Sequence, residues 1–176
     1  MRKLLYAAAG AAALAFAALP ASAGERYLHN GSKPCHLMPA YECSEMNVGL
    51  DNSGQFVILY SRPREGLGRI GIIPGTLLVS GRVYNGRFSG VSHRFRMMGT
   101  LRCSISYAVG GWYASGLNFV LEGPAPIFAE NRCAAAGFDP NNEQSHLFFA
   151  YAGPGSGPSA VPTDNGVVPK VQQANR

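Results

Sequence analysis

Apolar and polar residues alternate over short stretches in the middle of the chain, and turn-forming residues separate these stretches. The alternation predicts β-strands, since no long window shows a convincing helical period. Short strands at regular spacing are typical of an antiparallel barrel or sandwich, so we predict a small all-β domain of about six to eight strands. The clearest strands are expected at residues 55–61, 76–84, 87–97, 104–109, 117–121 and 146–151. One short helical turn is expected within residues 129–137.

The pair Asn85-Gly86 lies between two of these strands and is the strongest short hairpin signal in the chain. A two-residue turn at this pair sets the register by placing Tyr84 opposite Arg87. Each strand then has one apolar and one polar face. The apolar set, which we expect in the core, is Val91, Phe95 and Met97, and His93 falls on the same side as a half-buried histidine. The set expected on the solvent face is Ser92, Arg94 and Arg96.

The two ends of the chain differ from this middle part. Residues 1–23 combine a basic start, an apolar alanine-rich run and small residues at the end, which is the pattern of a cleavable export signal, with cleavage after Ala23. A transmembrane anchor is the alternative, but the apolar run is shorter than the roughly 20 residues that a spanning helix needs. Residues 152–176 are rich in Gly, Pro, Ser, Asn and Gln, which predicts a disordered tail.

All four cysteines lie in residues 24–151, which we expect to form one domain with residues 24–51 as its disulfide-bearing N-terminal segment. An even number of cysteines in an exported chain indicates two disulfides. We therefore predict a periplasmic or secreted protein with no membrane span after signal cleavage. Four cysteines allow three pairings. Proximity along the chain favours the pairs Cys35–Cys43 and Cys103–Cys133.

A zinc site built from Cys35, His36 and Cys43 is the alternative use of the first two cysteines. Structural zinc sites usually draw on cysteines spaced C-x₂₋₄-C, whereas the spacing here is C-x₇-C. We therefore expect no metal in this segment. We expect no cofactor elsewhere in the chain either.

One glycine pattern, at residues 66–71, matches the dinucleotide-binding signature G-x-G-x-x-G letter for letter. That chemistry requires the pattern to open a helix and an acidic residue to follow about 20 positions later. Here Pro74-Gly75 follows at once, and no Asp or Glu occurs between Glu65 and Glu122. We interpret the pattern as a glycine-rich connection between strands.

The sequence offers no catalytic arrangement that passes a similar test. Ser156 lies between two glycines but outside the G-x-S-x-G pattern of a nucleophilic serine. Glu122 and Glu130 are candidates for a carboxylate pair, yet nothing around them requires that they meet. Asp51 begins a stretch that resembles a calcium loop and then lacks the later ligands. We predict that the protein is not an enzyme.

The basic residues are distributed unevenly along the chain. Between Asn52 and Leu121 there are eight arginines, no lysine and one acidic residue, Glu65. The guanidinium group binds carboxylate, phosphate and sulfate groups through paired hydrogen bonds and stacks on aromatic rings. The alternative is that the arginine stems cover β surfaces while their charges stay solvated. The residues predicted to bind an anionic ligand are Arg62, Arg64, Arg94, Arg96, Trp112 and Tyr113.

Several short sequence motifs within residues 27–151 together carry a resemblance to a known kind of module. They lie at residues 29–32 (HNGS), 60–64 (YSRPR), 73–78 (IPGTLL), 87–90 (RFSG), 103–109 and 121–126 (LEGPAP), with Cys133 after them. This set resembles a β-rich module of uncharacterised secreted or periplasmic proteins of α-proteobacteria. The resemblance implies an exported β domain in which Cys103 pairs with Cys133, and it implies no activity. Cys35 and Cys43 are additional to the module.

These features together predict an exported, non-catalytic binding or envelope-associated β module. Its expected partner is an anionic envelope glycan or a protein, and we do not expect nucleic acid. The alternative is a small secreted β-barrel that inhibits a lysozyme or a protease by binding it.

Overall fold

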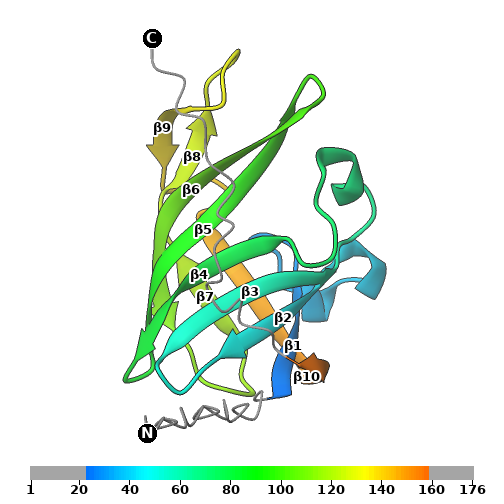
Figure 1. Ribbon diagram of the computed structural model, residues 1–176, viewed down its shortest axis with the longest axis vertical. Helices are drawn as coiled ribbons and strands as arrows, with labels where there is room; N and C mark the ends of the chain where they lie inside the picture. The colour runs from blue at the N-terminus through cyan, green and yellow to red at the C-terminus, as the bar shows by residue number, and fades with distance from the viewer. Residues whose placement is uncertain (1–22, 159–176) are drawn as a thin grey trace, which may run out of the picture.

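Eight antiparallel strands close into a barrel in the computed structural model (Figure 1), which describes residues 23–158. Each barrel strand pairs with the next one, and the last pairs with the first, as in up-and-down barrels. The barrel strands are β1 (Ala23–His29), β2 (Ser44–Leu50), β3 (Gln55–Arg62), β4 (Leu77–Tyr84), β5 (Arg87–Met98), β6 (Leu101–Trp112), β7 (Phe119–Glu122) and β10 (His146–Pro158). Between β7 and β10, the strands β8 (Ala125–Phe128) and β9 (Ala135–Asp139) form a separate two-stranded sheet. The prediction of an all-β barrel is confirmed.

All six predicted strands overlap observed ones, and β1, β2, β8 and β9 were not predicted. β2 buries Met46 and Val48 but alternates them with polar residues over a short length, so its apolar signal is weak. The strands β8 and β9 have only four and five residues. The helical turn predicted within residues 129–137 is wrong, because Ala135 begins β9 and pairs with Phe128.

The β4–β5 hairpin has the register predicted from its two-residue turn, but the faces of β5 are reversed next to the turn, whereas Phe95 further along the strand is partly buried against the core as predicted. The inward face of β5 carries Phe88 and Ser92, which are almost fully buried, whereas Val91 lies outside and is 37 % exposed. The core position predicted for Val91 is therefore wrong. The solvent positions predicted for Ser92, Arg94 and Arg96 are wrong as well, since Arg94 and Arg96 continue the inward face.

Phe88 explains why this face turns inward. Gly81 and Gly90 lie opposite each other on β4 and β5, and the Phe88 ring covers both. A Cβ added at Gly90 would come within 2.6 Å of that ring. The ring also packs against Phe56, with 5.1 Å between centroids. Bare glycine backbone beneath an aromatic ring thus decides which side of the hairpin joins the core.

Aromatic side chains fill the barrel end near the β4–β5 turn, which we call the closed end. The Phe119 ring lies at its centre, 5.0 Å from the Tyr27 ring, 5.3 Å from the Tyr113 ring and 4.7 Å from the Phe149 ring. Offset and edge-to-face ring pairs of this kind add to the stabilisation from apolar burial. The barrel interior at this end is therefore packed core rather than open space.

Two disulfides connect the segments outside the barrel to it. Cys35–Cys43 closes the loop between β1 and β2, and Cys103–Cys133 ties β6 to the loop between β8 and β9. Both predicted pairings are confirmed. The longer bridge closes about 30 residues and stabilises the fold by about 3–4 kcal/mol in the chain-entropy account. Two disulfides in so small a domain indicate an oxidising, extracytoplasmic environment.

Both ends of the described chain belong to the barrel. Ala23 faces Pro158 where β1 pairs with β10, so strand pairing extends beyond residue 152, where the disordered tail was predicted to begin. That boundary is wrong by several residues. The rest of the predicted tail and the predicted signal lie outside the described residues, apart from Ala23. Among residues 23–158, no helix is long and apolar enough to cross a bilayer.

Candidate functional site

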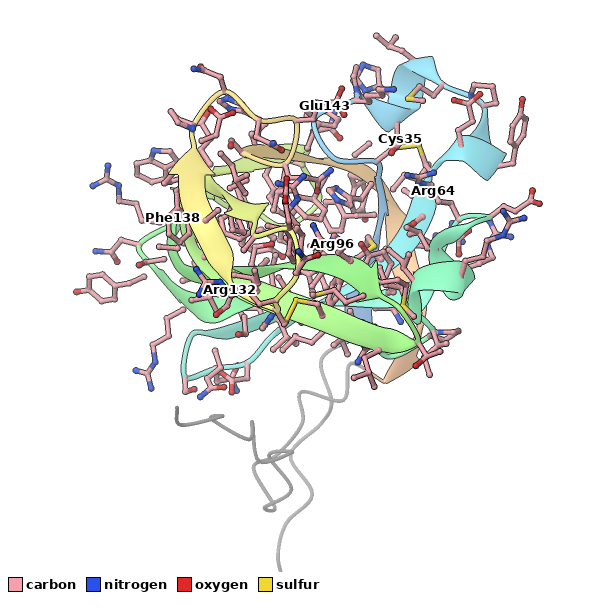
Figure 2. All side chains as sticks on the ribbon, turned by 90° about the horizontal axis from the view of Figure 1, so that it is seen from above. Cys35, Arg64, Arg96, Arg132, Phe138 and Glu143 are labelled. Carbon is pink, nitrogen blue, oxygen red and sulfur yellow. A yellow bond between two sulfur atoms is a disulfide. The ribbon has the colours of Figure 1, made fainter. Side chains whose placement is uncertain are left out.

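The barrel end opposite the closed end holds a cavity of about 230 Å³, which we call the mouth. Figure 2 looks down on it, with β9 on one side and the short helices η1 (Cys35–Leu37) and η2 (Ala40–Glu42) on the other. The polar residues of its wall are His29, Asn30, Ser44, Tyr60, Arg64, His93, Arg94 and Gln144. The apolar residues are Leu67, Ile70, Ile72, Leu78 and Phe95.

The loop between β3 and β4 supplies most of the apolar wall. It contains the short helix η3 (Leu67–Ile70), and Gly66 and Gly71 bound this helix with φ of 88° and 73°. Positive φ favours glycine, so the glycine pattern at residues 66–71 serves to turn the chain at both ends of η3. The pattern is therefore part of a connection between strands, as predicted, and it places Leu67 and Ile70 over the mouth.

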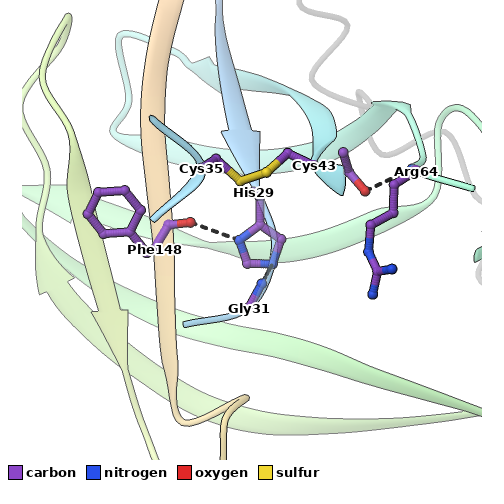
Figure 3. The surroundings of a disulfide bond; sticks show 7 residues. His29, Gly31, Cys35, Cys43, Arg64 and Phe148 are labelled. Carbon is purple, nitrogen blue, oxygen red and sulfur yellow. Dashed lines mark hydrogen bonds between the residues drawn. A yellow bond between two sulfur atoms is a disulfide. The ribbon is translucent and has the colours of Figure 1, made fainter. Parts of the chain in front are cut away.

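His29 lies at the floor of the mouth, almost fully buried. Its Nδ1 lies 3.0 Å from the Phe148 carbonyl oxygen, and its Nε2 lies 3.3 Å from the Gly31 backbone nitrogen, which donates to it (Figure 3). One ring nitrogen therefore donates and the other accepts, which defines the neutral form. Burial lowers the pKa of His29 to about 4, and the positive charge of Arg64 acts in the same direction. His29 is thus a neutral structural residue whose two nitrogens are both in use.

Tyr60 differs from His29 because its polar atom has no partner. The side chain is only 6 % exposed, and it lines the mouth. No described residue forms a hydrogen bond with its hydroxyl group. Burial raises the pKa of Tyr60, so the hydroxyl keeps its proton and remains a donor. The hydroxyl is not one of the sealed, unpartnered polar atoms of the described residues, which are Arg26 Nε and Ser61 Oγ, so it lies open to the cavity and is free to donate to a ligand there.

Arg64 and Arg94 bring positive charge to the mouth. The backbone nitrogen of Arg64 donates to Ser44 Oγ at 3.0 Å, which fixes the start of its side chain (Figure 3). Within residues 23–158, the Arg64 guanidinium forms no ion pair. Arg94 is half-buried and donates through Nη1 to the Pro126 carbonyl oxygen. No acidic side chain is present among the described residues that line the mouth, so the potential there is positive.

Arg96 and Arg94 also hold the β8–β9 sheet in place. The Arg96 Nη2 donates to the carbonyl oxygens of Ala129 and Glu130 at 3.1 Å and 2.8 Å. The guanidinium carbons of Arg94 and Arg96 lie 5.6 Å and 5.1 Å from the Phe128 ring centroid. Arg96 is therefore committed to contacts within the chain, whereas Arg94 has this structural role and a place in the mouth.

The remaining predicted binding residues do not join the mouth. Arg62 is exposed and forms an ion pair of 2.7 Å with Glu45. Trp112 lies at the other end of the barrel, 64 % exposed. Tyr113 is buried there, and its hydroxyl donates to Glu25 Oε2 at 2.6 Å. The structure thus brings together Arg64 and Arg94 of the six and separates the other four.

Several residues of the mouth were missed by sequence reasoning. Tyr60 carried a usable signal, because Phe56, Ile58 and Tyr60 alternate along β3 and so share its inward face. A tyrosine at the end of such an apolar series places a hydroxyl at the end of a barrel. His29 and Gln144 carried no comparable signal, because β1 and the loop before β10 have no clear pattern in the sequence.

The wall of the mouth has two chemically different sides. The described residues contain no group of three or more His, Cys, Asp or Glu side chains arranged to hold a metal ion. The wall combines hydrogen-bond donors and positive charge on one side with aliphatic groups on the other. The first side offers groups that can hydrogen-bond an anion, and the second offers apolar contact surface.

A scan against protein-family models, a search of curated proteins and a search of solved structures each found no match for this chain. The resemblance to a secreted α-proteobacterial module therefore stays a prediction. The chain's function has to be argued from its own geometry.

Proposed function

We propose that this protein is an exported, non-catalytic binding module that takes up an anionic group in the mouth of its barrel. The hydroxyl of Tyr60 carries the proposal, since it is a donor on the cavity wall with no acceptor among the described residues, beside an arginine that forms no ion pair with them. A carboxylate, phosphate or sulfate group supplies the acceptor oxygens that the protein does not.

The electrostatics of the mouth favour an anion over a neutral ligand. Arg64 and Arg94 contribute two positive charges, and His29 is neutral with both nitrogens engaged. Apolar walls concentrate the field of such charges at the opening. The ligand's negative charge therefore meets two guanidinium groups in a partly desolvated site.

The size of the mouth limits what enters it. At about 230 Å³ it is smaller than the roughly 300–1,000 Å³ typical of pockets for whole drug-sized ligands. A small anion, or the acidic end group of a larger molecule, fits this volume. Leu67, Ile70 and Phe95 then contact the apolar part next to the acidic group.

The proposed location is the periplasm or the outside of the cell, after removal of residues 1–23. The two disulfides support an oxidising compartment. Acidic end groups of envelope glycans and free organic anions both occur in such a compartment, and they share the chemistry that the mouth recognises.

Calorimetric titration at low salt tests the proposal with three probes: inorganic phosphate, glucuronate and octanoate. We expect glucuronate or octanoate to bind, and the stronger of the two identifies the source of the acidic group. Arg64→Gln and Tyr60→Phe should each weaken that binding about 10- to 100-fold, the value of a hydrogen bond to a charged group.

Arg69→Gln is the matched control, because Arg69 is exposed on the same loop and does not line the mouth. It should leave the affinity unchanged. Absence of binding by all three probes contradicts the proposal, and so does an equal loss in the Arg69 and Arg64 variants.

A protein partner is the second candidate function, and one observation favours it. The loop closed by Cys35–Cys43 presents Leu37 and Tyr41, which are 74 % and 76 % exposed. Large apolar side chains on a cross-linked loop are a feature of protein-binding sites, including those of inhibitors. If the double variant Leu37→Ser with Tyr41→Ser abolishes capture of a lysozyme or protease that the native protein binds, this candidate is supported.

A further inference from the structure

The outer face of the sheet carries a second group of exposed aromatic and basic side chains, far from the mouth. Tyr84, Arg87 and Trp112 lie in one row across β4, β5 and β6, because Tyr84 pairs with Arg87 and Arg87 pairs with Trp112. Tyr84 is 78 % exposed, Trp112 is 64 % exposed, and Arg87 is exposed between them. We call this row the aromatic platform.

The platform has a shallow cleft beside it. Arg87, Ser89, Gly110 and Trp112 line a cavity of about 380 Å³ on this face. Gly110 leaves the floor of the cleft bare, and a Cβ added there would meet nothing closer than the Phe88 carbonyl oxygen at 3.4 Å. A flat ring lying on Trp112 therefore has room to extend over the sheet.

Core packing does not account for these side chains. Tyr84 and Trp112 point away from the barrel interior, and the ring of Trp112 lies over Gly86 in the turn. The Arg87 guanidinium carbon lies 5.5 Å from the Trp112 ring centroid, and within residues 23–158 Arg87 forms no ion pair. Exposed aromatic side chains grouped with an unpaired cation mark a binding surface.

We propose that the aromatic platform binds an acidic polysaccharide. The apolar faces of two sugar rings stack on Tyr84 and Trp112, which lie two strand spacings or roughly 10 Å apart, a distance that a disaccharide spans. The guanidinium of Arg87 between them donates to a carboxylate or sulfate group, and the Ser89 hydroxyl donates to a sugar hydroxyl.

The modest charge of this face favours a glycan over a nucleic acid. The row of the platform contains one arginine, Arg87. The next outward-facing row contains Arg82 and ends at Glu122, which pairs with His146. A nucleic acid carries one charge per nucleotide and needs a series of basic contacts. A polysaccharide with an acidic group on some of its sugars matches a single central arginine.

This site is independent of the mouth. Arg87 and Arg94 are seven positions apart along β5, so roughly 20 Å separates them. Failure of binding at one site therefore leaves the other proposal standing.

Trp112 is the only tryptophan of the chain, so its fluorescence reports directly on the platform. Titration with tetragalacturonate should shift or quench the emission, whereas the neutral maltotetraose should bind at least tenfold more weakly. Arg87→Gln should weaken tetragalacturonate binding at least tenfold, and so should Gly110→Val, which fills the cleft and leaves Trp112 in place. Arg64→Gln should have no effect.

Calorimetry extends the test to Trp112→Ala, with Leu101→Ala as the matched control, because Leu101 is 74 % exposed at the other end of the same strand. Only the Trp112 variant should lose binding. The proposal is overturned if tetragalacturonate produces neither fluorescence change nor heat, if maltotetraose binds equally well, if an eight-residue oligothymidylate binds more tightly, or if Leu101→Ala loses as much affinity.

Discussion

The two ends of the barrel contain similar polar groups but use them differently. At the closed end, the Glu25 carboxylate accepts hydrogen bonds from Tyr27 at 2.8 Å, from Tyr113 at 2.6 Å and from Ser115. At the mouth, the Tyr60 hydroxyl has no partner among the described residues. The comparison shows that the hydroxyl groups at the closed end are engaged within the chain, whereas a hydroxyl group on the wall of the cavity stays available to a ligand.

The protonation of the closed end follows from these contacts. Burial raises the pKa of Glu25, but hydrogen bonds from Ser115, Tyr113 and Tyr27 and from the Gly116 backbone outweigh it and hold the pKa below its usual value. Burial and the adjacent carboxylate raise the pKa of Tyr113. The carboxylate therefore stays ionised and the phenols stay protonated at neutral pH, which keeps the network intact.

The largest expected effect is a loss of stability as the pH falls, which arises in different pH ranges from His29 at the mouth and from Glu25 at the closed end. The pKa of His29 falls from 6.5 in the unfolded chain to about 4 in the folded one, so below pH 6.5 the unfolded chain binds a proton that the folded chain excludes. The free energy of unfolding should fall by about 3 kcal/mol between pH 6.5 and 4. Burial also lowers the pKa of His93, which adds to the loss in the same window.

Urea denaturation at a series of pH values measures this loss. His29→Gln keeps a donor and an acceptor and should flatten the slope between pH 6.5 and 4. Glu25 stabilises the fold above its unfolded pKa of 4.5, and this contribution is lost as the pH falls through its lower folded pKa. Glu25→Gln should therefore lower the free energy of unfolding at neutral pH and flatten its pH dependence only in the more acidic window. An unchanged slope in the His29 variant would contradict the assignment.

The next effect compares two tyrosines. Tyr113→Phe removes a hydrogen bond to a charged group, so it should lower the free energy of unfolding by about 2 kcal/mol. Tyr60→Phe removes a hydroxyl that has no partner and should leave stability unchanged or slightly raised. Thermal and urea denaturation of both variants provide the measurement. Equal destabilisation by the two changes would show that the Tyr60 hydroxyl is already engaged.

The smallest expected effect concerns an arginine outside both ends. Arg62 forms an exposed ion pair with Glu45 at 2.7 Å, and such pairs contribute about 0.2–1 kcal/mol. Arg62→Gln should lower the free energy of unfolding by less than 1 kcal/mol and leave anion binding in the mouth unchanged. A loss of binding comparable to that of Arg64→Gln would extend the recognition site beyond the mouth.

The strands were predictable because alternation and turn residues are local properties. A few neighbouring positions are enough to predict the strand at residues 55–61 and the turn at Asn85-Gly86, and both predictions are confirmed. Two residues of the mouth, Arg64 and Arg94, were also predicted, since they were selected for the chemistry of the guanidinium group. Tyr60 could have been added from its inward position on β3.

The orientation of β5 was not predictable from alternation, because both of its faces repeat every second residue. The direction depends on Phe88 covering Gly81 and Gly90, which is a contact between strands. The same holds for Arg96, whose acceptors lie more than 30 residues away in the loop after β8. A sequence shows that an arginine is present but not which carbonyl groups will surround it.

The all-β class, most strand positions, the hairpin register and the pairing of the cysteines by proximity follow from the amino-acid sequence alone, because each of these depends on residues close along the chain. Which arginines meet, and which tyrosine faces the cavity without a partner among the described residues, depends on the folded barrel. Closing the barrel brings β1, β3 and β5 to one opening and places Trp112 and Tyr113 at the other end. Those juxtapositions depend on the closure of the whole sheet, and no local pattern encodes them.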